Sequence, residues 1–345
     1  MRLINTSTLI LSEFFGSDIP QYAIFSHTWE RNSEVTYQQW IAPHTDALIK
    51  KSGYQKIIGA CRIARSHEID WMWVDTNCID KTSSAELSEA INSMFTWYHA
   101  AVECYVHMAD VSLQQNSDVG KQPAFRESKW FTRGWTLQEL LAPREVIFYS
   151  RDWVKLGSRD GDLLLQAISE VTGIKREALS SIKEMSDSSV AAKMSWLSRR
   201  RTTREEDMAY CMLGIFDLNM PLLYGEGRKA FTRLQEEIIK TSSDQSIFAW
   251  TWNDDVPSDW TSILAPSPST FSQAANIFAY SKRNSTSYSI TNVGLSIELP
   301  LAHSFGNSWI LLNIWNGAGV FESLCLPVRR RHKNFSGLYC RCDVP

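Results

Sequence analysis

The chain lacks three features that would narrow its class at once: a long apolar run, a surplus of charge and paired cysteines. No apolar run approaches the roughly 20 residues that a membrane-spanning helix needs, so we expect no membrane span. The 345 residues carry a net charge of −3, which gives no electrostatic case for nucleic acid as a partner. The seven cysteines are an odd number without paired spacing, which indicates reduced, buried thiols.

Further absences concern targeting and nucleotide motifs. The first residues contain no secretory hydrophobic run, so we expect a cytoplasmic protein. There is no Gly-x-x-x-x-Gly-Lys-Ser/Thr motif, and hence no P-loop nucleotide switch. No repeat at a solenoid or propeller period occurs, and no cysteine or histidine spacing fits a standard metal site, so we predict no metal.

What is present divides into three stretches, and the first is predicted to be an α/β domain over residues 1–150. Its strands are indicated by short apolar runs at 22–26, 71–75, 102–108 and 146–149. Helical spacing lies between them, at 53–68 and after Ser83. Runs that are apolar on both faces favour strands buried by helices on two sides. We therefore predict an α/β fold: an open, mainly parallel sheet flanked by helices.

The remaining two stretches differ from the first and from each other. Helical patterns at 162–171, 190–199, 202–213 and 227–240 predict a helical extension over residues 151–245. After that, Ser, Thr, Asn and Pro become frequent and short β-type runs appear at 247–252, 295–299, 309–315 and 324–328. These runs predict a small antiparallel β-rich unit over residues 246–345.

Polar residues follow the predicted parallel strands, where sheets of this class bind their ligands. One helix is predicted to start from the same edge, over 131–143, with Thr132 as its N-cap and Pro143 at its end. Trp135 and Glu139 lie four residues apart and so share one face of it. Together, the residues predicted to form a site at this edge are Ser26, His27, Trp29, Asp75, Cys78, Asp80, Trp135 and Glu139.

Each of these residues also has a purely structural interpretation. Glu139 is either a catalytic carboxylate or a structural helix residue, and His27 is either an acid–base group or a support for its loop. Asp75 and Asp80 bind ribose hydroxyls or a cation, or else cap the loop and helix that follow them. A nucleophilic Cys78 is disfavoured because no activating basic environment is assured.

Three blocks in this stretch resemble the fungal heterokaryon-incompatibility (HET) domain. They are Ala23-Ile-Phe-Ser-His-Thr-Trp29, Trp73-Val-Asp-Thr-Asn-Cys-Ile-Asp80 and Arg133-Gly-Trp-Thr-Leu-Gln-Glu139, in the family's order. Lys81 is a small departure, because the family more often has Gln there. The resemblance implies a role in non-self recognition between fungal strains, with programmed cell death after incompatible fusion.

HET domains are in turn remotely similar to TIR domains, which implies a TIR/flavodoxin-like sheet. In enzymatic TIR domains, a glutamate on the corresponding helix supports cleavage of NAD at the nicotinamide–ribose bond. Carried over by position, this residue is Glu139, and Trp29 or Trp135 would stack on a ring of the substrate. NAD would be a substrate, with no cofactor required.

The resemblance also implies self-association through the HET domain and an incompatibility partner protein. The alternative is a non-enzymatic signalling and oligomerisation module, or an inactive regulatory relative.

Overall fold

The computed structural model describes residues 1–30, 32–112, 118–279, 288–292, 294–304, 307–317, 323–330 and 339–341. Contacts group the chain into two compact units. Unit 1 comprises Met1–Met185 with Asn219–Leu222, and unit 2 comprises Ser186–Leu218 with Leu223–Pro345. The division into three parts at 150 and 245 stays a prediction.

Unit 1 is built on one seven-stranded sheet. Four central strands run parallel in the order β4-β3-β5-β6, and antiparallel strands close both edges, β1 and β2 beside β4 and β7 beside β6. In sheet order, the strands are β2 (Leu11–Glu13), β1 (Arg2–Asn5), β4 (Trp71–Val74), β3 (Ala23–His27), β5 (Glu103–Met108), β6 (Val146–Ser150) and β7 (Lys155–Ser158). The predicted fold class is therefore confirmed.

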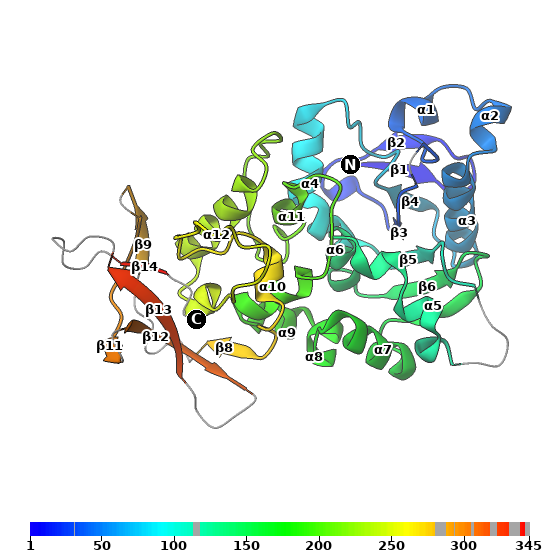
Figure 1. Cartoon of the computed structure of the whole chain (residues 1–345). Coiled ribbons are helices and arrows are strands. Elements are labelled where there is room, and N and C mark those ends of the chain that lie inside the picture. Colours follow the sequence, from blue (N-terminus) through cyan, green and yellow to red (C-terminus); the bar gives the residue numbers. More distant parts are fainter. Residues whose placement is uncertain are drawn as a thin grey trace. The chain divides into compact units, whose positions relative to one another are not determined.

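Helices cover both faces of this sheet, as the apolar runs predicted (Figure 1). On one face, Trp73 of β4 packs against Trp97 and Tyr98 of α4 (Ser84–Ala100), with ring centroids 5.6 and 5.8 Å apart. On the other face lies α3 (Ser52–Ser66), whose Gly59 approaches the indole of Trp153. Burial of large aromatic side chains on both faces supplies most of the driving force for this layer.

The strand order places a topological switch point between β3 and β5. The chain passes from β3 through α3 to β4 on one side, and then through α4 to β5 on the other side of β3. The order 2-1-3-4 of the parallel strands is that of flavodoxin-like sheets, in which ligands bind outside the carboxyl ends at this point. The end of β3 is therefore the position of greatest functional interest.

Short helices complete unit 1. They are α1 (Tyr37–Ile41), α2 (Asp46–Ile49), α5 (Pro123–Arg126), α6 (Thr136–Leu141), α7 (Asp162–Thr172), α8 (Arg176–Ser180) and the 3-10 helices η1 (Gly16–Asp18), η2 (Val119–Lys121) and η3 (Lys129–Thr132). The helix α9 (Ile182–Asp187) contains the boundary between the units.

The predicted single helix over 131–143 is wrong in its first half. Residues Lys129–Thr132 form η3, and α6 begins only at Thr136. Thr132 is not an N-cap: its hydroxyl donates to the carbonyl of Lys129 (2.9 Å) within the preceding turn. The buried hydroxyl of Thr136 donates to the carbonyls of Trp130 (2.6 Å) and Arg133 (2.8 Å), which fixes the break between the two helices.

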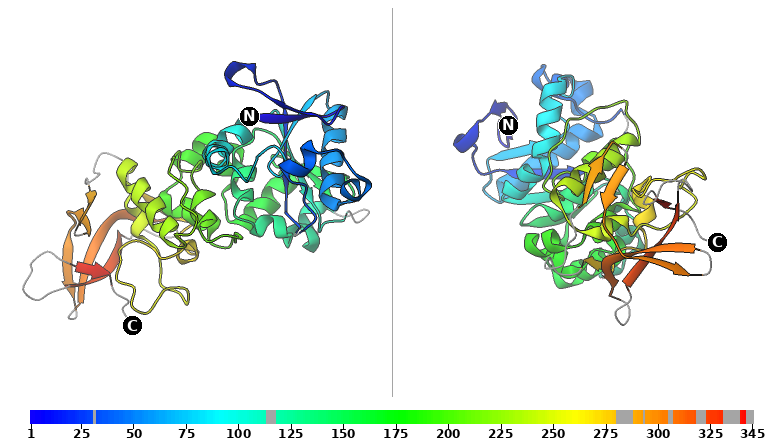
Figure 2. Two further views of the ribbon diagram at one scale, coloured as in Figure 1. Left: turned by 90° about the horizontal axis from the view of Figure 1, so that it is seen from above. Right: turned by 90° about the vertical axis from the view of Figure 1, so that its left-hand side faces the viewer.

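Unit 2 combines helices with two antiparallel sheets, whose strands run from yellow-orange to red in Figure 2. The larger sheet has the order β11-β12-β13-β14, with β8 also paired to β12, and β9 pairs with β10. The helices are α10 (Val190–Leu197), α11 (Asp207–Tyr210), α12 (Lys229–Thr241), η4 (Gln245–Phe248) and η5 (Pro268–Phe271). The strands are β8 (Ile277–Ala279), β9 (Tyr288–Thr291), β10 (Gly294–Ile297), β11 (Leu301–Ser304), β12 (Asn307–Asn316), β13 (Ser323–Arg330) and β14 (Tyr339–Arg341).

Two predicted elements of unit 2 are wrong. The helix over 202–213 shrinks to α11, because the Thr202 hydroxyl donates to the carbonyl of Arg204 (2.5 Å) instead of capping a helix. The run at 247–252 is a 3-10 turn and loop, because the carbonyls of Phe248 and Trp250 accept hydrogen bonds from the Arg341 side chain. No helix among the described residues is long and apolar enough to cross a bilayer.

The close approach of α3 to Trp153 generates a stability prediction. A Cβ at Gly59 would overlap the indole of Trp153, which is itself packed on Phe25 and His107 with ring centroids 5.7 and 4.7 Å apart. We expect Gly59→Val to lower the free energy of unfolding by about 1–3 kcal/mol, measured by urea denaturation. The matched control is Arg62→Val, which places the same side chain at an exposed position of α3. Equal effects of the two substitutions would contradict the packing argument.

Candidate functional site

A buried hydrogen-bonded chain joins the end of β3 to η3 and α6. The hydroxyl of Ser26 donates to the carboxylate of Glu139, and the indole Nε1 of Trp130 donates to the same hydroxyl oxygen (2.8 Å). An indole N–H can only donate, so Trp130 forces Ser26 to accept from it and directs the hydroxyl proton to Glu139. Ser26 is 1% exposed, Trp130 0% and Glu139 7%.

The segment that carries this carboxylate is fixed at both ends. Before it, Asp110 accepts from the hydroxyl of Ser128 (2.6 Å) and the backbone N–H of Lys129 (2.8 Å), which anchors η3 after β5. After it, the buried guanidinium of Arg159 donates to the carbonyls of Leu140, Pro143 and Arg144 at 2.9–3.0 Å. Arg159 thus satisfies carbonyls at the carboxyl end of α6. Glu139 is held in place and is not a freely moving surface residue.

The carboxylate of Glu139 lies in a buried part of the domain. Burial, with a smaller contribution from the negative charge of Glu139, raises the pKa of Tyr98 and Cys104 well above their ordinary values. A carboxylate in such surroundings interacts strongly with any positive charge that develops beside it. Chemically, the arrangement can stabilise a cationic sugar ring, provided that the ring reaches the carboxylate.

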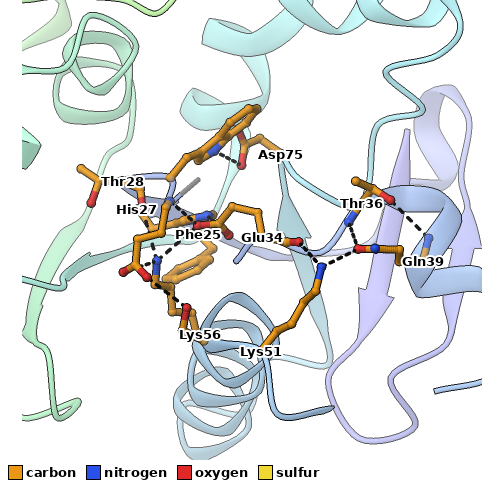
Figure 3. Close-up of polar contacts among 12 residues, drawn as sticks. Phe25, His27, Thr28, Glu34, Thr36, Gln39, Lys51, Lys56 and Asp75 are labelled. Carbon is orange, nitrogen blue, oxygen red and sulfur yellow. Dashed lines mark hydrogen bonds and ion pairs between the residues drawn. The ribbon is translucent and has the colours of Figure 1, made fainter. Parts of the chain in front are cut away.

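His27 lies on the opposite face of the sheet from Ser26. Its ring stacks on Phe25 (centroids 4.6 Å apart), and its Nε2 lies 3.2 Å from the carboxylate of Glu34. Figure 3 shows Lys56 extending from α3 into the same cluster, where its ammonium lies 3.3 Å from Glu34 and donates to the carbonyl of Thr28 (3.3 Å). Ser26 and His27 therefore do not act as a pair.

The cluster holds the loop after β3 in one conformation. The carboxylate of Glu34 also accepts from the backbone N–H of Glu30 (2.9 Å), which closes the loop on itself. Burial alone raises the pKa of Glu34, but His27, the Glu30 amide and Lys56 outweigh it and lower the pKa to about 2. These contacts favour the loop-supporting role for His27 over an acid–base role.

Trp29 is the exposed aromatic residue of this edge, at 41%. Its indole N–H donates to Asp75 (3.4 Å), which joins the ends of β3 and β4. The ammonium of Lys81 lies 3.6 Å from the ring centroid and the guanidinium of Arg133 4.9 Å. Such cation–π contacts fix the ring and surround it with positive charge.

The other predicted site residues have structural contacts. Asp80 accepts from Gln38 (2.6 Å) and from the N–H and hydroxyl of Thr82 (2.9 and 2.6 Å), as a loop cap does. Cys78 is buried and accepts from the N–H of Val74 (3.3 Å), and burial raises the pKa of its thiol to about 12, so it is no nucleophile. Trp135 is half-buried directly before α6. Among the described residues, no cluster of side chains is suited to hold a metal ion.

Sequence reasoning missed Trp130, Glu34 and Lys56, and gave Asn77 no role of its own. Asn77 is completely buried after β4, and neither polar atom of its side-chain amide has a hydrogen-bond partner among the described residues. Buried amides are normally paired, so a polar group entering this edge would find both a donor and an acceptor there. One feature of the sequence could have indicated a role for Trp130: it is a tryptophan in a short polar segment, five residues before Trp135.

The fold and the site together define a flavodoxin-like α/β domain with a buried carboxylate at the switch point of its sheet. The sequence matches the family described as "Heterokaryon incompatibility protein (HET)" over residues 22–123 and a domain of unknown function, DUF8212, over residues 229–287. It is 48% identical over 227 residues, 64% of this chain, to the vegetative incompatibility protein HET-E-1 of Podospora anserina. The chain therefore contains a region, residues 22–123, that matches the HET family, and it is similar to a fungal vegetative incompatibility protein.

The match has clear limits. The chain spans only 16% of the length of HET-E-1, and the HET family match ends at residue 123, before η3 and α6. No solved structure matches the chain. The choice of Glu139 as a site residue therefore depends on its geometry and on the third sequence block, and not on the family match.

The lowered pKa of Glu34 predicts a pH-dependent contribution to stability. The unfolded carboxyl binds protons below pH 4.5, whereas the folded one does so only near pH 2, so acid favours the unfolded chain. Relative to Glu34→Gln, we expect the wild type to be more stable by about 2–3 kcal/mol at pH 7, an advantage that is lost between pH 4.5 and 2.

The measurement is urea denaturation of both proteins across this pH range. His107, whose pKa burial lowers to about 4, also destabilises the fold in acid, but it affects both proteins and cancels in the difference. The control is Glu89→Gln at an exposed position of α4, expected within about 0.5 kcal/mol of wild type. A difference that stays constant with pH would show that the carboxylate of Glu34 is not the stabilising group.

Proposed function

We propose that this chain acts in heterokaryon incompatibility, as an effector of programmed cell death in fungal non-self recognition. The observation that carries the proposal is the 48% identity over 227 residues to a vegetative incompatibility protein, together with the HET family match. In this proposal, unit 1 is the effector domain and an incompatibility partner protein supplies the trigger.

A finer proposal concerns the chemistry: the HET domain cleaves NAD at the nicotinamide–ribose bond through Glu139. Loss of nicotinamide leaves a positively charged, oxocarbenium-like ribose, and a carboxylate beside it stabilises that charge. Its support is positional. Glu139 lies at the switch point where such sheets bind ligands, and Ser26 and Trp130 hold its carboxylate at the end of β3.

The neighbouring groups suit such a substrate. Lys81, which pairs with Asp75 at 3.9 Å, and Arg133 lie over the ring of Trp29, and this exposed indole offers a surface on which a ring of the substrate can stack. Against this stands the burial of Glu139, which is 7% exposed and has to be uncovered before a ribose can reach it. Self-association through the HET domain is our proposal for how that opening is stabilised.

The alternative function is a non-enzymatic signalling and oligomerisation module. The burial of Glu139 favours this alternative, because a carboxylate that accepts from Ser26 also holds α6 against β3, with Trp130 bonded to the same serine. In that case, the charged Trp29 edge would be a contact surface for another protein and not a substrate site.

Overexpression of the full chain in a filamentous fungus tests the effector role, because a high concentration favours assembly without the trigger from the partner protein. We expect the wild type to reduce the number of viable colonies, and Glu89→Gln to reduce it equally, because that residue is exposed and remote from the end of β3. A chain that accumulates in cells without any loss of viability would overturn the proposal of an effector.

Nicotinamide release tests the chemistry. Purified wild-type protein, concentrated to favour assembly, is incubated with NAD, and we expect release that Glu139→Gln reduces by at least about 100-fold. Gln keeps the shape and can still accept from Ser26, so thermal melting should show that the variant is folded. If the wild type kills cells without releasing nicotinamide, the enzyme proposal fails and the signalling module stands. Equal release by both proteins would mean that Glu139 is not the catalytic residue.

A further inference from the structure

A pocket of about 590 Å³ lies wholly within unit 2. Three segments line it: residues 198–208 after α10, the beginning of α12 at Arg228 and Phe231, and residues 255–269. Its volume is in the range of sites that bind small organic molecules. None of its lining residues belongs to the site at the end of β3.

The charge of the pocket is positive. Four arginines and two carboxylates line it, which leaves a surplus of two positive charges. The arginines are Arg199, Arg200, Arg201 and Arg228, and the carboxylates are Glu205 and Asp255. Both carboxylates already have partners in unit 2: Asp255 accepts from the hydroxyl of Ser269 (2.6 Å), and Glu205 pairs with Arg228 at 3.8 Å. Within the part of the chain that the structure describes, no ion pair neutralises Arg199 or Arg201.

The arginine run is anchored and adjoins a helix start. Arg200 is 4% exposed, and its Nε donates to the carbonyl of Trp196 (3.2 Å), which fixes the backbone between two exposed arginines. Arg228 is the N-cap residue of the 13-residue helix α12, whose N-terminus adds positive partial charge to the same pocket. Guanidinium groups are matched to phosphate oxygens in both shape and charge.

The glycine turn before α12 is not available for the same purpose. The carboxylate of Glu206 accepts from the N–H groups of Gly225 (2.7 Å) and Gly227 (3.1 Å), in the position that a bound phosphate would take. An anion in unit 2 is therefore directed to the arginine-lined pocket.

The rest of the lining is apolar. Met208, Phe231, Pro266 and Pro268 provide a surface for a ring or chain. We propose that this pocket binds a small organic polyphosphate of the nucleotide class, with Arg199 and Arg201 on the phosphates and the apolar residues against the organic part. The proposal does not depend on the effector role or on NAD cleavage.

Isothermal titration calorimetry on the full chain at low salt tests it, with ATP, inorganic pyrophosphate and adenosine as probes. We expect ATP and pyrophosphate to bind, and adenosine to bind at least about tenfold more weakly than ATP. The affinities for ATP and for pyrophosphate should both fall with added salt. The double variant Arg199→Gln/Arg201→Gln should weaken ATP binding by about tenfold or more. The control Arg176→Gln removes an exposed arginine of unit 1 and should bind as the wild type does.

The absence of heat with both ATP and pyrophosphate would overturn the proposal, as would adenosine binding as tightly as ATP. Wild-type affinity in the double variant would also overturn it. Both arginines are exposed, so the double variant should melt with the wild type, and the single variants Arg199→Gln and Arg201→Gln replace it if it does not.

Discussion

The buried carboxylate of Glu139 is the constraint on which the structure at the end of β3 depends. A carboxylate removed from water costs several kcal/mol unless hydrogen bonds compensate for it. Ser26 supplies such a bond, and Trp130 orients the serine so that its single proton is committed to Glu139. These hydrogen bonds form only if η3 and α6 keep their positions. Asp110 contributes to this, because it anchors η3 after β5. One strand, one 3-10 helix and one α-helix therefore form a single polar unit inside an apolar layer.

The two faces of β3 have different tasks at its carboxyl end. On one face, the hydroxyl of Ser26 is bonded to Glu139 and Trp130, whereas the other face holds the cluster of His27, Glu34 and Lys56 that shapes the following loop (Figure 3). That loop carries Trp29 into contact with Asp75, so the ends of β3 and β4 are joined across the sheet edge. The edge is consequently preformed on the outside, whereas the side chain of Glu139 is buried.

The sequence predicted what depends on local pattern and missed what depends on distant partners. The strand at 71–74 is a continuous apolar run, and such a run has few alternatives in a covered sheet. The break before α6 was missed because the hydroxyl of Thr136 bonds the carbonyls of Trp130 and Arg133, and nothing in the sequence pattern signals these bonds. The pairing of Ser26 with Glu139 spans 113 residues and came from topology and resemblance, whereas Glu34 sits in a polar loop that no pattern distinguishes.

The antiparallel strands at the two edges of the unit 1 sheet have a consequence for assembly. A parallel core ends in rows of unpaired backbone groups, and here the antiparallel strands β1 and β7 pair with them, while the outermost strands of the sheet, β2 and β7, have only three and four residues. Strands this short expose few unpaired backbone groups, so a strand of a neighbouring chain would gain few hydrogen bonds by pairing with them. Strand addition therefore does not favour a polymer of this domain. Copies of this domain that gather around a trigger would have to meet through helices and loops, and the geometry of the resulting signal complex would be set by side chains and not by the backbone ladder.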